Sequence, residues 1–183
     1  ETRNSHGKAF AIVMELLTGG SFADRIREKP SEEQLVRWVE QVASALSYMH
    51  ARKMQHRDLK PDNVLFDKFN TAKIIDLGLA CTLESKSRVS TRSGGAVGAN
   101  LYMSPEKGGG KSYDAKDDVW ALGCMVVGGA LGTPMESMGL NTQGTFALNR
   151  SGVDDLISRA KAATEALGSL ASRMLEQEPR KRL

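Results

Sequence analysis

Cysteine, long apolar runs and an excess of one charge sign are all scarce in this chain, and each shortage excludes a class of protein. The two cysteines, Cys81 and Cys124, lie far apart, which argues against a disulfide scaffold. Apolar runs stay well below the roughly 20 residues that a membrane-spanning helix needs. The net charge of +3 is spread along the chain and therefore indicates neither a nucleic-acid partner nor a membrane partner.

The remaining composition is that of an ordinary globular domain. The 183 residues are 26% charged and 40% hydrophobic, which is enough for one core. No signal peptide is recognisable, and the chain does not start with Met, which suggests a segment cut from a longer protein. We expect an intracellular, cytoplasmic location, and no feature of the sequence indicates an oligomeric state.

The most informative segment is His56-Arg57-Asp58-Leu59-Lys60-Pro61-Asp62-Asn63. It resembles the catalytic loop of eukaryotic protein kinases, H-R-D-L-x-x-x-N. Phosphoryl transfer requires mainly positioning and charge neutralisation from the protein. The resemblance implies that Asp58 meets the attacking hydroxyl, that Lys60 reaches the transferred phosphate and that Asn63 holds a metal ion.

A second block, Ala-Lys-Ile-Ile-Asp-Leu-Gly at residues 72–78, is a short apolar strand that ends in an acid and a glycine. It resembles the D-F-G motif of kinases, with Leu77 in place of Phe. The resemblance implies that Asp76, together with Asn63, holds Mg²⁺ on the ATP phosphates, with Mn²⁺ as an alternative. Between the two blocks, the residues from Val64 to Asn70 predict a strand and the turn of a hairpin.

Two further blocks are expected to meet in space. Tyr-Met-Ser-Pro-Glu at residues 102–106 resembles the A-P-E motif that closes the kinase activation segment. Glu-Pro-Arg-Lys-Arg-Leu at residues 178–183 places Arg182 at the arginine of the D-P-x-x-R pattern. In the family this arginine pairs with the glutamate of A-P-E, so the resemblance implies a buried ion pair between Glu106 and Arg182.

A fifth block and a polar loop complete the pattern. Residues 117–124 resemble the buried kinase helix whose leading aspartate, here Asp118, bonds the catalytic-loop backbone. The stretch from Thr82 to Ala96 resembles a mobile activation loop, and Arg57 is the phosphate receiver that the resemblance implies. The candidate phosphosites share a hydroxyl and lie within this loop: Ser85, Ser87, Ser90, Thr91 and Ser93. A polar loop without a specific phosphosite is an equal alternative.

The subtype follows from the catalytic loop and from the end of the activation segment. Lys60, two residues after Asp58, is typical of serine/threonine kinases. The phrase Val-Gly-Ala-Asn-Leu-Tyr-Met-Ser-Pro-Glu at residues 97–106 is most similar to NIMA-related and STE-type kinases. Ala99 stands where those kinases have a threonine that bridges the catalytic aspartate and lysine. The change removes a hydrogen bond that contributes roughly 1.5–3 kcal/mol.

The first part of the kinase pattern is absent from this sequence. No glycine-rich loop, V-A-I-K lysine or partner glutamate precedes the hinge. Residues 1–183 are therefore identified as a partial protein kinase domain, with the last small-lobe strand and hinge at 8–20 and the C-terminal lobe at 21–183. The implied fold is α+β and protein-kinase-like, with a mainly α-helical large lobe, a short catalytic-site hairpin and an N-terminal lobe that is mostly missing.

The nucleotide site implied by the resemblance begins in this hinge. Residues 9–14 form a continuous apolar run and predict a buried strand. Met14 matches the gatekeeper position, and adenine would pair with the hinge backbone. The implied nucleotide-binding set is Met14, Glu15, Leu17, Ser21, Leu65 and Asp76.

Helical spacing predicts the large lobe. A short helix is expected from Ser21 to Lys29, and a capping box at Ser31 and Gln34 opens a longer helix that ends near Arg52. His50 is interpreted as packing at the end of that helix. Residues 128–150 are interpreted as a loop with at most one helix, and residues 153–177 as helical.

These patterns predict ATP-dependent phosphorylation of Ser or Thr in protein substrates, with Mg²⁺ as cofactor and little activity from this chain alone. Two alternatives stay open. A pseudokinase-like scaffold is favoured by Ala99 and by the absent small-lobe motifs, but the retained Asp58, Lys60, Asn63 and Asp76 argue against it. A small-molecule phosphotransferase of the same fold shares the Asp and Asn, whereas the Lys60-Pro61 pair and the segment 102–106 favour protein substrates.

Overall fold

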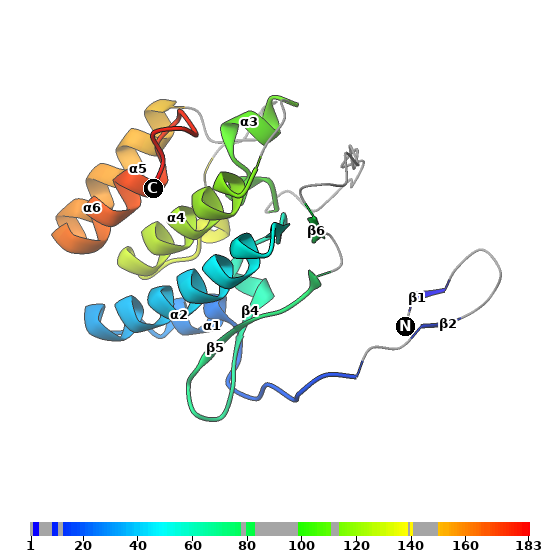
Figure 1. Ribbon diagram of the computed structural model, residues 1–183. Coiled ribbons are helices and arrows are strands. Elements are labelled where there is room, and N and C mark those ends of the chain that lie inside the picture. The colour runs from blue at the N-terminus through cyan, green and yellow to red at the C-terminus, as the bar shows by residue number, and fades with distance from the viewer. Residues whose placement is uncertain are drawn as a thin grey trace.

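Helices make up most of the structure, and the strands are short (Figure 1). The computed structural model describes residues 2–3, 9–10, 13–77, 80–82, 99–110, 114–138, 140 and 150–183. The α-helices span Phe22–Arg27 (α1), Glu32–Ala51 (α2), Pro105–Gly108 (α3), Lys116–Ala130 (α4), Arg150–Ala163 (α5) and Glu165–Met174 (α6). The 3₁₀ turns span Pro61–Asn63 (η1), Ala99–Tyr102 (η3) and Met135–Ser137 (η4).

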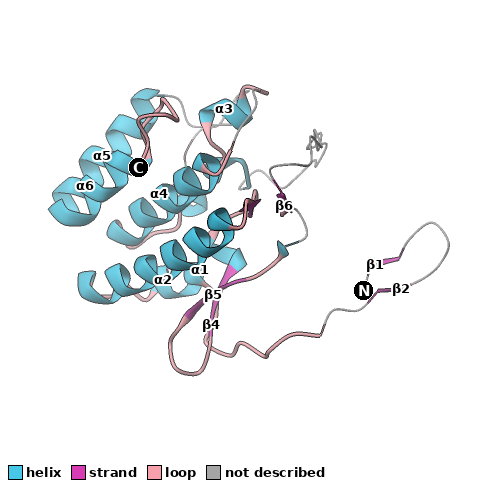
Figure 2. Cartoon of the chain, in the orientation of Figure 1, coloured by secondary structure: helices cyan, strands magenta, loops and turns pink. Residues whose placement is uncertain are grey.

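The described strands form three antiparallel pairs, each with two strands, at one side of the helices (Figure 2). Thr2–Arg3 (β1) pairs with Ala9–Phe10 (β2), and Met54–Gln55 (β3) pairs with Cys81–Thr82 (β6). Val64–Phe66 (β4) and Ala72–Ile74 (β5) form the hairpin that the sequence predicts. This mostly helical architecture with small two-stranded sheets agrees with the expected fold class at that coarse level.

The chain before α1 adds a further backbone pairing to the edge of the hairpin. The amide of Gly19 donates to the carbonyl of Phe66 at 2.8 Å, and the amide of Phe66 donates to the carbonyl of Gly20 at 3.0 Å. A Cβ at residue 19 would lie 2.7 Å from the Cβ of Phe66, so this close approach requires glycine. The pairing fixes the start of α1 against the hairpin.

Serine caps begin both of the first two helices. Ser31 accepts a hydrogen bond from the amide of Gln34 at 3.2 Å, which confirms it as the cap of α2. The full reciprocal capping box lies at α1, where Ser21 accepts from the amide of Asp24 and the Asp24 carboxylate accepts from the amide of Ser21. Helix α2 then runs to its C-cap at Arg52, where the sequence predicts its end.

Helix α4 is buried on nearly every face and forms the centre of the core. It is surrounded by apolar side chains from α2, α5 and α6. The helix continues through Gly128 and Gly129 to Ala130, so the prediction of a loop from residue 128 is wrong at its start. A Cβ at residue 129 would lie 2.5 Å from Cδ2 of Leu35, so the glycine allows α2 to approach closely.

The helical stretch predicted for residues 153–177 is divided into two helices. Thr164 has an extended backbone, with φ −146°, and separates α5 from α6. A Cβ at Gly168 would lie 2.4 Å from the backbone nitrogen of Lys161, so the two helices are in close contact just beyond this break. The helical prediction for this stretch is therefore confirmed for most of its length, and the break at Thr164 is a feature that helical spacing alone does not reveal.

The expected buried strand at residues 9–14 is not seen in the part of this run that the structure describes beyond β2, which spans Ala9–Phe10. Val13 and Met14 have no assigned secondary structure. Val13 is 96% exposed, and Leu16 is also exposed. An apolar residue is buried only where another layer covers it, and the described elements leave Val13 and Met14 exposed.

Some of the predicted features fall on residues that the structure does not describe. The proposed phosphosites between residues 85 and 93 and the glycine at residue 78 lie outside the described residues. Cys124 is fully buried, and burial raises the pKa of its thiol far above the ordinary value. Within the described ranges, no helix combines the length and apolar character needed to cross a bilayer.

Candidate active site

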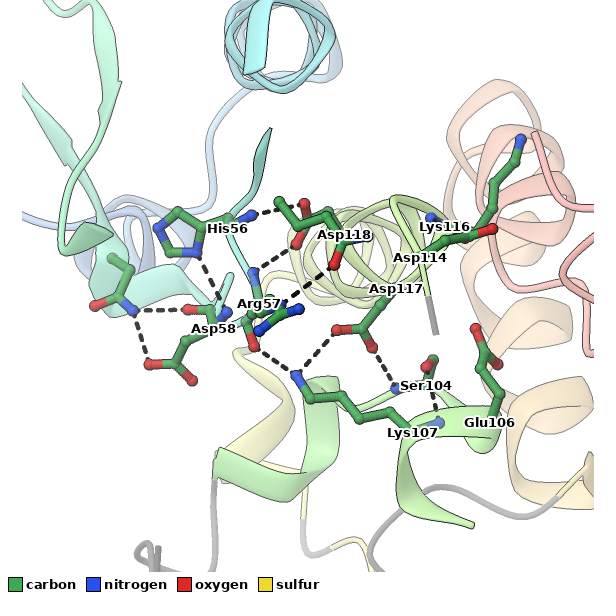
Figure 3. Close-up of polar contacts among 12 residues, drawn as sticks. His56, Arg57, Asp58, Ser104, Glu106, Lys107, Asp114, Lys116, Asp117 and Asp118 are labelled. Atoms are coloured by element: carbon green, nitrogen blue, oxygen red, sulfur yellow. Dashed lines mark hydrogen bonds and ion pairs between the residues drawn. The ribbon is translucent and has the colours of Figure 1, made fainter. Parts of the chain in front are cut away.

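The catalytic-loop residues connect strand β3 to the turn η1. Figure 3 labels the first three of them, His56, Arg57 and Asp58. Asn63 donates through Nδ2 to the carbonyl oxygen of Asp58 at 2.7 Å and to its Oδ2 at 3.1 Å. Lys60 Nζ lies 3.0 Å from the same Oδ2. The structure therefore brings the three predicted catalytic side chains together at one carboxylate.

Asp76 is positioned beside this group by the backbone. The amide of Ile75 donates to the carbonyl of Asn63 at 2.9 Å, and Asp76 follows with φ +60°, a left-handed conformation that an aspartate tolerates better than most residues. The Ile75 carbonyl lies 2.9 Å from Nε2 of His56. The end of β5 is thus attached to the catalytic loop at two points.

The chemistry of Asn63 and Asp76 fits Mg²⁺. The amide nitrogen of Asn63 is directed at Asp58, and an amide oxygen together with a carboxylate is the kind of donor set that Mg²⁺ uses with substrate phosphates. Within the described residues, no group of three or more His, Cys, Asp and Glu side chains could hold a metal ion by itself. Asn63 and Asp76 therefore fit a metal ion whose remaining ligands come from a bound nucleotide.

Asp118 fixes the first part of the loop from the amino end of α4. Its Oδ2 accepts from the amide of His56 at 2.9 Å, and its Oδ1 accepts from the amide of Arg57 at 2.9 Å (Figure 3). His50 Nε2 lies 2.8 Å from Oδ2. Burial opposes ionisation, but these hydrogen bonds hold the pKa of Asp118 below its ordinary value. The contact expected between Asp118 and the loop backbone is present.

A second buried acid, Asp117, lies next to Asp118 and contacts the loop through a lysine. Lys107 Nζ lies 2.9 Å from Oδ2 of Asp117 and also donates to the carbonyl oxygen of Arg57 (Figure 3). The amide of Ser104 donates to Oδ1 of Asp117 at 3.3 Å. Burial raises the pKa of Asp117, and the Lys107 ammonium opposes that rise.

Arg57 has an unusual backbone conformation at the point where these contacts converge. Its φ is +69°, in the left-handed region that costs a non-glycine residue roughly 1–2 kcal/mol. Its guanidinium Nε donates to Oε1 of Gln55 at 3.3 Å. Hydrogen bonds from both sides of the residue hold a conformation that would otherwise relax.

Glu106 and Arg182 form the predicted ion pair. Arg182 donates through Nη1 and Nη2 to the two carboxylate oxygens at 2.7 and 3.0 Å. Its side chain is 0% exposed and that of Glu106 is 8% exposed. Although burial raises it, hydrogen bonds from Arg182 hold the pKa of Glu106 below its ordinary value overall. The pair joins α3 to the last residues of the chain.

The residues predicted to bind nucleotide fall into two groups. Ser21 and Leu65 are directly opposed in a β-bridge at the edge of the hairpin, close in sequence to Asn63. Met14, Glu15 and Leu17 lie on the extended segment before it, where Glu15 pairs with Lys73 of β5 at 3.2 Å. The structure therefore attaches the segment to the hairpin through an ion pair and a bridge.

Sequence reasoning missed three residues that support the site. His50 was interpreted as packing, and Lys107 and Asp117 were assigned no role. A signal for Asp117 was present, because a second acid beside Asp118 is unusual at the start of an otherwise apolar helix. No local pattern indicated His50 or Lys107, whose contacts join residues 68 and 50 positions apart.

Comparison with known proteins is consistent with this geometry. Serine/threonine-protein kinase Nek4 of Mus musculus is 40% identical over 119 residues, which cover 63% of this chain and 15% of that relative. Nek8 of Danio rerio is 40% identical over 124 residues, 65% of this chain and 17% of the relative. Serine/threonine-protein kinase pak-1 of Caenorhabditis elegans is 36% identical over 124 residues, which cover 67% of this chain and 21% of that relative.

The chain spans about a sixth to a fifth of the length of these relatives. The sequence profile of the protein kinase domain matches residues 3–183, which is nearly the whole chain. This chain belongs to the protein kinase domain family.

Proposed function

We propose that the domain containing this chain transfers phosphate from ATP to serine or threonine in protein substrates, with Mg²⁺ as cofactor and Mn²⁺ as an alternative. The main observation that supports this proposal is that the side chains of Lys60 and Asn63 both contact the carboxylate of Asp58. Its support is the anchoring of the preceding backbone by Asp118. The relatives are named serine/threonine-protein kinases, which agrees with the lysine at residue 60.

Each residue of the group has a chemical role in this proposal. Asp58 orients the substrate hydroxyl and accepts its proton as the oxygen attacks. Lys60, 3.0 Å from Asp58, supplies a positive charge beside the transferred phosphate. Asn63 and Asp76 hold Mg²⁺, which neutralises phosphate charge when bound. The roles require the oxygen of Asn63 to face away from Asp58, as its amide orientation implies.

Nucleotide binding is proposed for the edge of the hairpin and the extended segment before it. Adenine would pair with the backbone at Glu15 and Leu17, beside Met14, with Ser21 and Leu65 below it. The ion pair between Glu15 and Lys73 and the bridge between Ser21 and Leu65 keep this segment beside the hairpin. Protein substrates, rather than small molecules, are favoured by Lys60 and by the segment 102–106.

A pseudokinase-like binding module is the second candidate, and one observation favours it. Ala99 lacks the hydroxyl that would connect Asp58 with Lys60, so one charge-assisted bond of roughly 1.5–3 kcal/mol is absent. Lys60 nevertheless contacts Asp58 directly. The two candidates differ in whether bound nucleotide is turned over.

The test compares the chain as it stands with the chain joined to a kinase small lobe that supplies the glycine-rich loop, strand lysine and helix glutamate. We expect negligible transfer from radiolabelled ATP to a protein substrate by the former and clear transfer by the latter. Asp58→Asn in the joined chain should lower the rate about 100- to 10,000-fold, because it removes the proton acceptor. Asp154→Asn, on the exposed face of α5, is the matched control and should leave the rate unchanged.

Three outcomes would decide against parts of the proposal. Nucleotide binding without transfer by the joined chain would favour the pseudokinase-like module. Transfer that survives Asp58→Asn would show that this carboxylate has been assigned wrongly. Strong, Asp58-dependent transfer by the chain alone would contradict the expectation that the small-lobe elements are required.

A further inference from the structure

The backbone on both sides of Arg57 is held by buried groups from outside the loop. Asp118 accepts hydrogen bonds from the amides of His56 and Arg57, both at 2.9 Å. Lys107 Nζ donates to the carbonyl oxygen of Arg57. Since the φ of Arg57 is +69°, this residue keeps its conformation only while its surroundings enforce it.

The carbonyl that Lys107 contacts belongs to the peptide group that leads into Asp58. The nitrogen of the same peptide, the amide of Asp58, donates to Nδ1 of His56 at 3.3 Å. One peptide group is therefore held at its oxygen by Lys107 and at its N–H by His56. A change in the ψ of Arg57 would break both contacts and reorient Asp58, and with it the carboxylate that Lys60 and Asn63 contact.

Lys107 is itself fixed by burial and by charge. Its side chain is 10% exposed and that of Asp117 is 5% exposed, and the two meet at 2.9 Å. The adjacent residue, Glu106, is tied to Arg182, so α3 has little freedom to shift. The two neighbouring acids of α4 thus reach the same loop residue, Asp118 directly and Asp117 through Lys107 (Figure 3).

We propose that Lys107, held by Asp117, is a positioning residue that orients Asp58 by binding the carbonyl of Arg57. Only the effect of this contact on phosphate transfer rests on the proposed function; the effect on the loop backbone does not. A further consequence is that α3, at the end of the activation segment, is coupled to the catalytic loop through the ammonium group of Lys107.

The first experiment measures amide hydrogen exchange by NMR in the wild-type chain and in Lys107→Met, which keeps the apolar stem and removes the ammonium. We expect exchange at the amides of Arg57 and Asp58 to become about 10- to 150-fold faster, the factor equivalent to the 1.5–3 kcal/mol of a hydrogen bond to a charged group. The amides of α5 and α6 should exchange at unchanged rates.

Three variants serve as comparisons in this experiment. Lys107→Arg keeps a charged donor and should retain most of the protection at the two amides. Asp117→Asn is a milder change that should give an intermediate acceleration, and it serves as the test if Lys107→Met does not fold. Lys181→Met is the matched control, because it removes an ammonium from an exposed ion pair with Glu178.

Three exchange results would overturn the proposal. Unchanged exchange at Arg57 and Asp58 in Lys107→Met would show that the ammonium does not hold this peptide. An equal acceleration throughout α5 and α6 would show a general stabilising role instead of a local one. Equal acceleration in Lys107→Arg and Lys107→Met would likewise show that donation by residue 107 is irrelevant.

The second experiment measures phosphate transfer by the chain joined to a small lobe. Lys107→Met should lower kcat by the same 10- to 150-fold while the KM for ATP changes less than twofold, because the nucleotide-binding residues are untouched. Lys181→Met should change neither constant. If the wild-type joined chain transfers no phosphate, the proposed function fails, but the exchange rates still decide the role of Lys107.

Discussion

Replacement of Arg182 tests how far the last residues of the chain stabilise the whole fold. The guanidinium donates to both oxygens of Glu106 and also to the carbonyls of Glu176 at 2.9 Å and Lys116 at 2.8 Å. It lies over the ring of Trp120, 5.0 Å from its centre. Arg182→Ala leaves a buried carboxylate and two partly buried carbonyls without these donors.

The expected cost follows from the one-sided loss of a buried ion pair. Breaking such a pair from one side costs about 3–5 kcal/mol of unfolding free energy. For a domain of this size, 1 kcal/mol shifts Tm by about 2–4 °C, so Arg182→Ala should lower Tm by roughly 6–20 °C. Arg180→Ala and Lys181→Ala, whose side chains are exposed, should each stay within about 0.5 kcal/mol of wild type.

The pH dependence adds an independent check on this reasoning. In the wild type the pKa of Glu106 is below its ordinary value, so the pair stabilises the fold above that value and the contribution is lost as pH falls through the lowered pKa. In Arg182→Ala, the hydrogen bonds and charge of Arg182 are lost, so the pKa of Glu106 should rise under the effect of burial, against the remaining hydrogen bonds from Ser104 and the backbone. The stability difference between the two proteins should therefore be largest near neutral pH and should narrow in acid.

Thermal and urea denaturation of the three variants between neutral and acidic pH decide the matter. Equal, small shifts for all three would refute the reasoning, because Arg182 would then behave as a surface charge. A large shift for Arg182→Ala that does not narrow in acid would show that packing over Trp120, rather than the carboxylate of Glu106, carries the effect.

Three further predictions concern other parts of the molecule. Ser31→Ala removes the cap of α2 and should cost about 1 kcal/mol in urea denaturation, and an unchanged midpoint would mean that the cap is dispensable. Gly168→Ala places a methyl group against Lys161 and should cost about 1–3 kcal/mol, whereas a stabilised variant would show that α5 and α6 can separate without loss. A crystal structure with Mg²⁺ and nucleotide should show oxygens of Asn63 and Asp76 on one ion, and ligands on opposite faces would contradict the proposed metal site.

The parts of the site that depend on neighbouring residues were predictable from the sequence. The loop from His56 to Asn63 and the hairpin β4–β5 are each formed by residues close together in the sequence, so spacing and composition indicate them. The pairing of Glu106 with Arg182 spans 76 positions and was predictable only through the family resemblance. The roles assigned to the catalytic, nucleotide-binding and metal-binding residues remain proposals.

The contacts that hold the loop from outside could not be predicted in the same way. His50 and Lys107 reach Asp118 and Arg57 because α2, α3 and α4 pack in a particular arrangement, and no sequence period encodes that arrangement. Likewise, an apolar run such as the one that includes Val13 predicts burial only if a covering layer exists. The sequence reports which side chains favour burial, whereas packing decides which of them are covered.

The two tryptophans lie in different regions of the molecule, so fluorescence can follow each region separately. Trp38 of α2 lies in an aromatic cluster, with ring centres 4.9 Å from Phe66 and 6.1 Å from Phe22. Trp120 of α4 lies beneath the guanidinium of Arg182. Both indoles are buried, so both are shielded from water in the folded chain. In a chain with Trp120→Phe, the remaining emission reports on the hairpin and on the first two helices alone. With Trp38→Phe, it reports on the contact between α4 and the final residues. A binding event or a substitution that loosens one region and leaves the other intact then shifts the emission maximum of only one of the two single-tryptophan proteins.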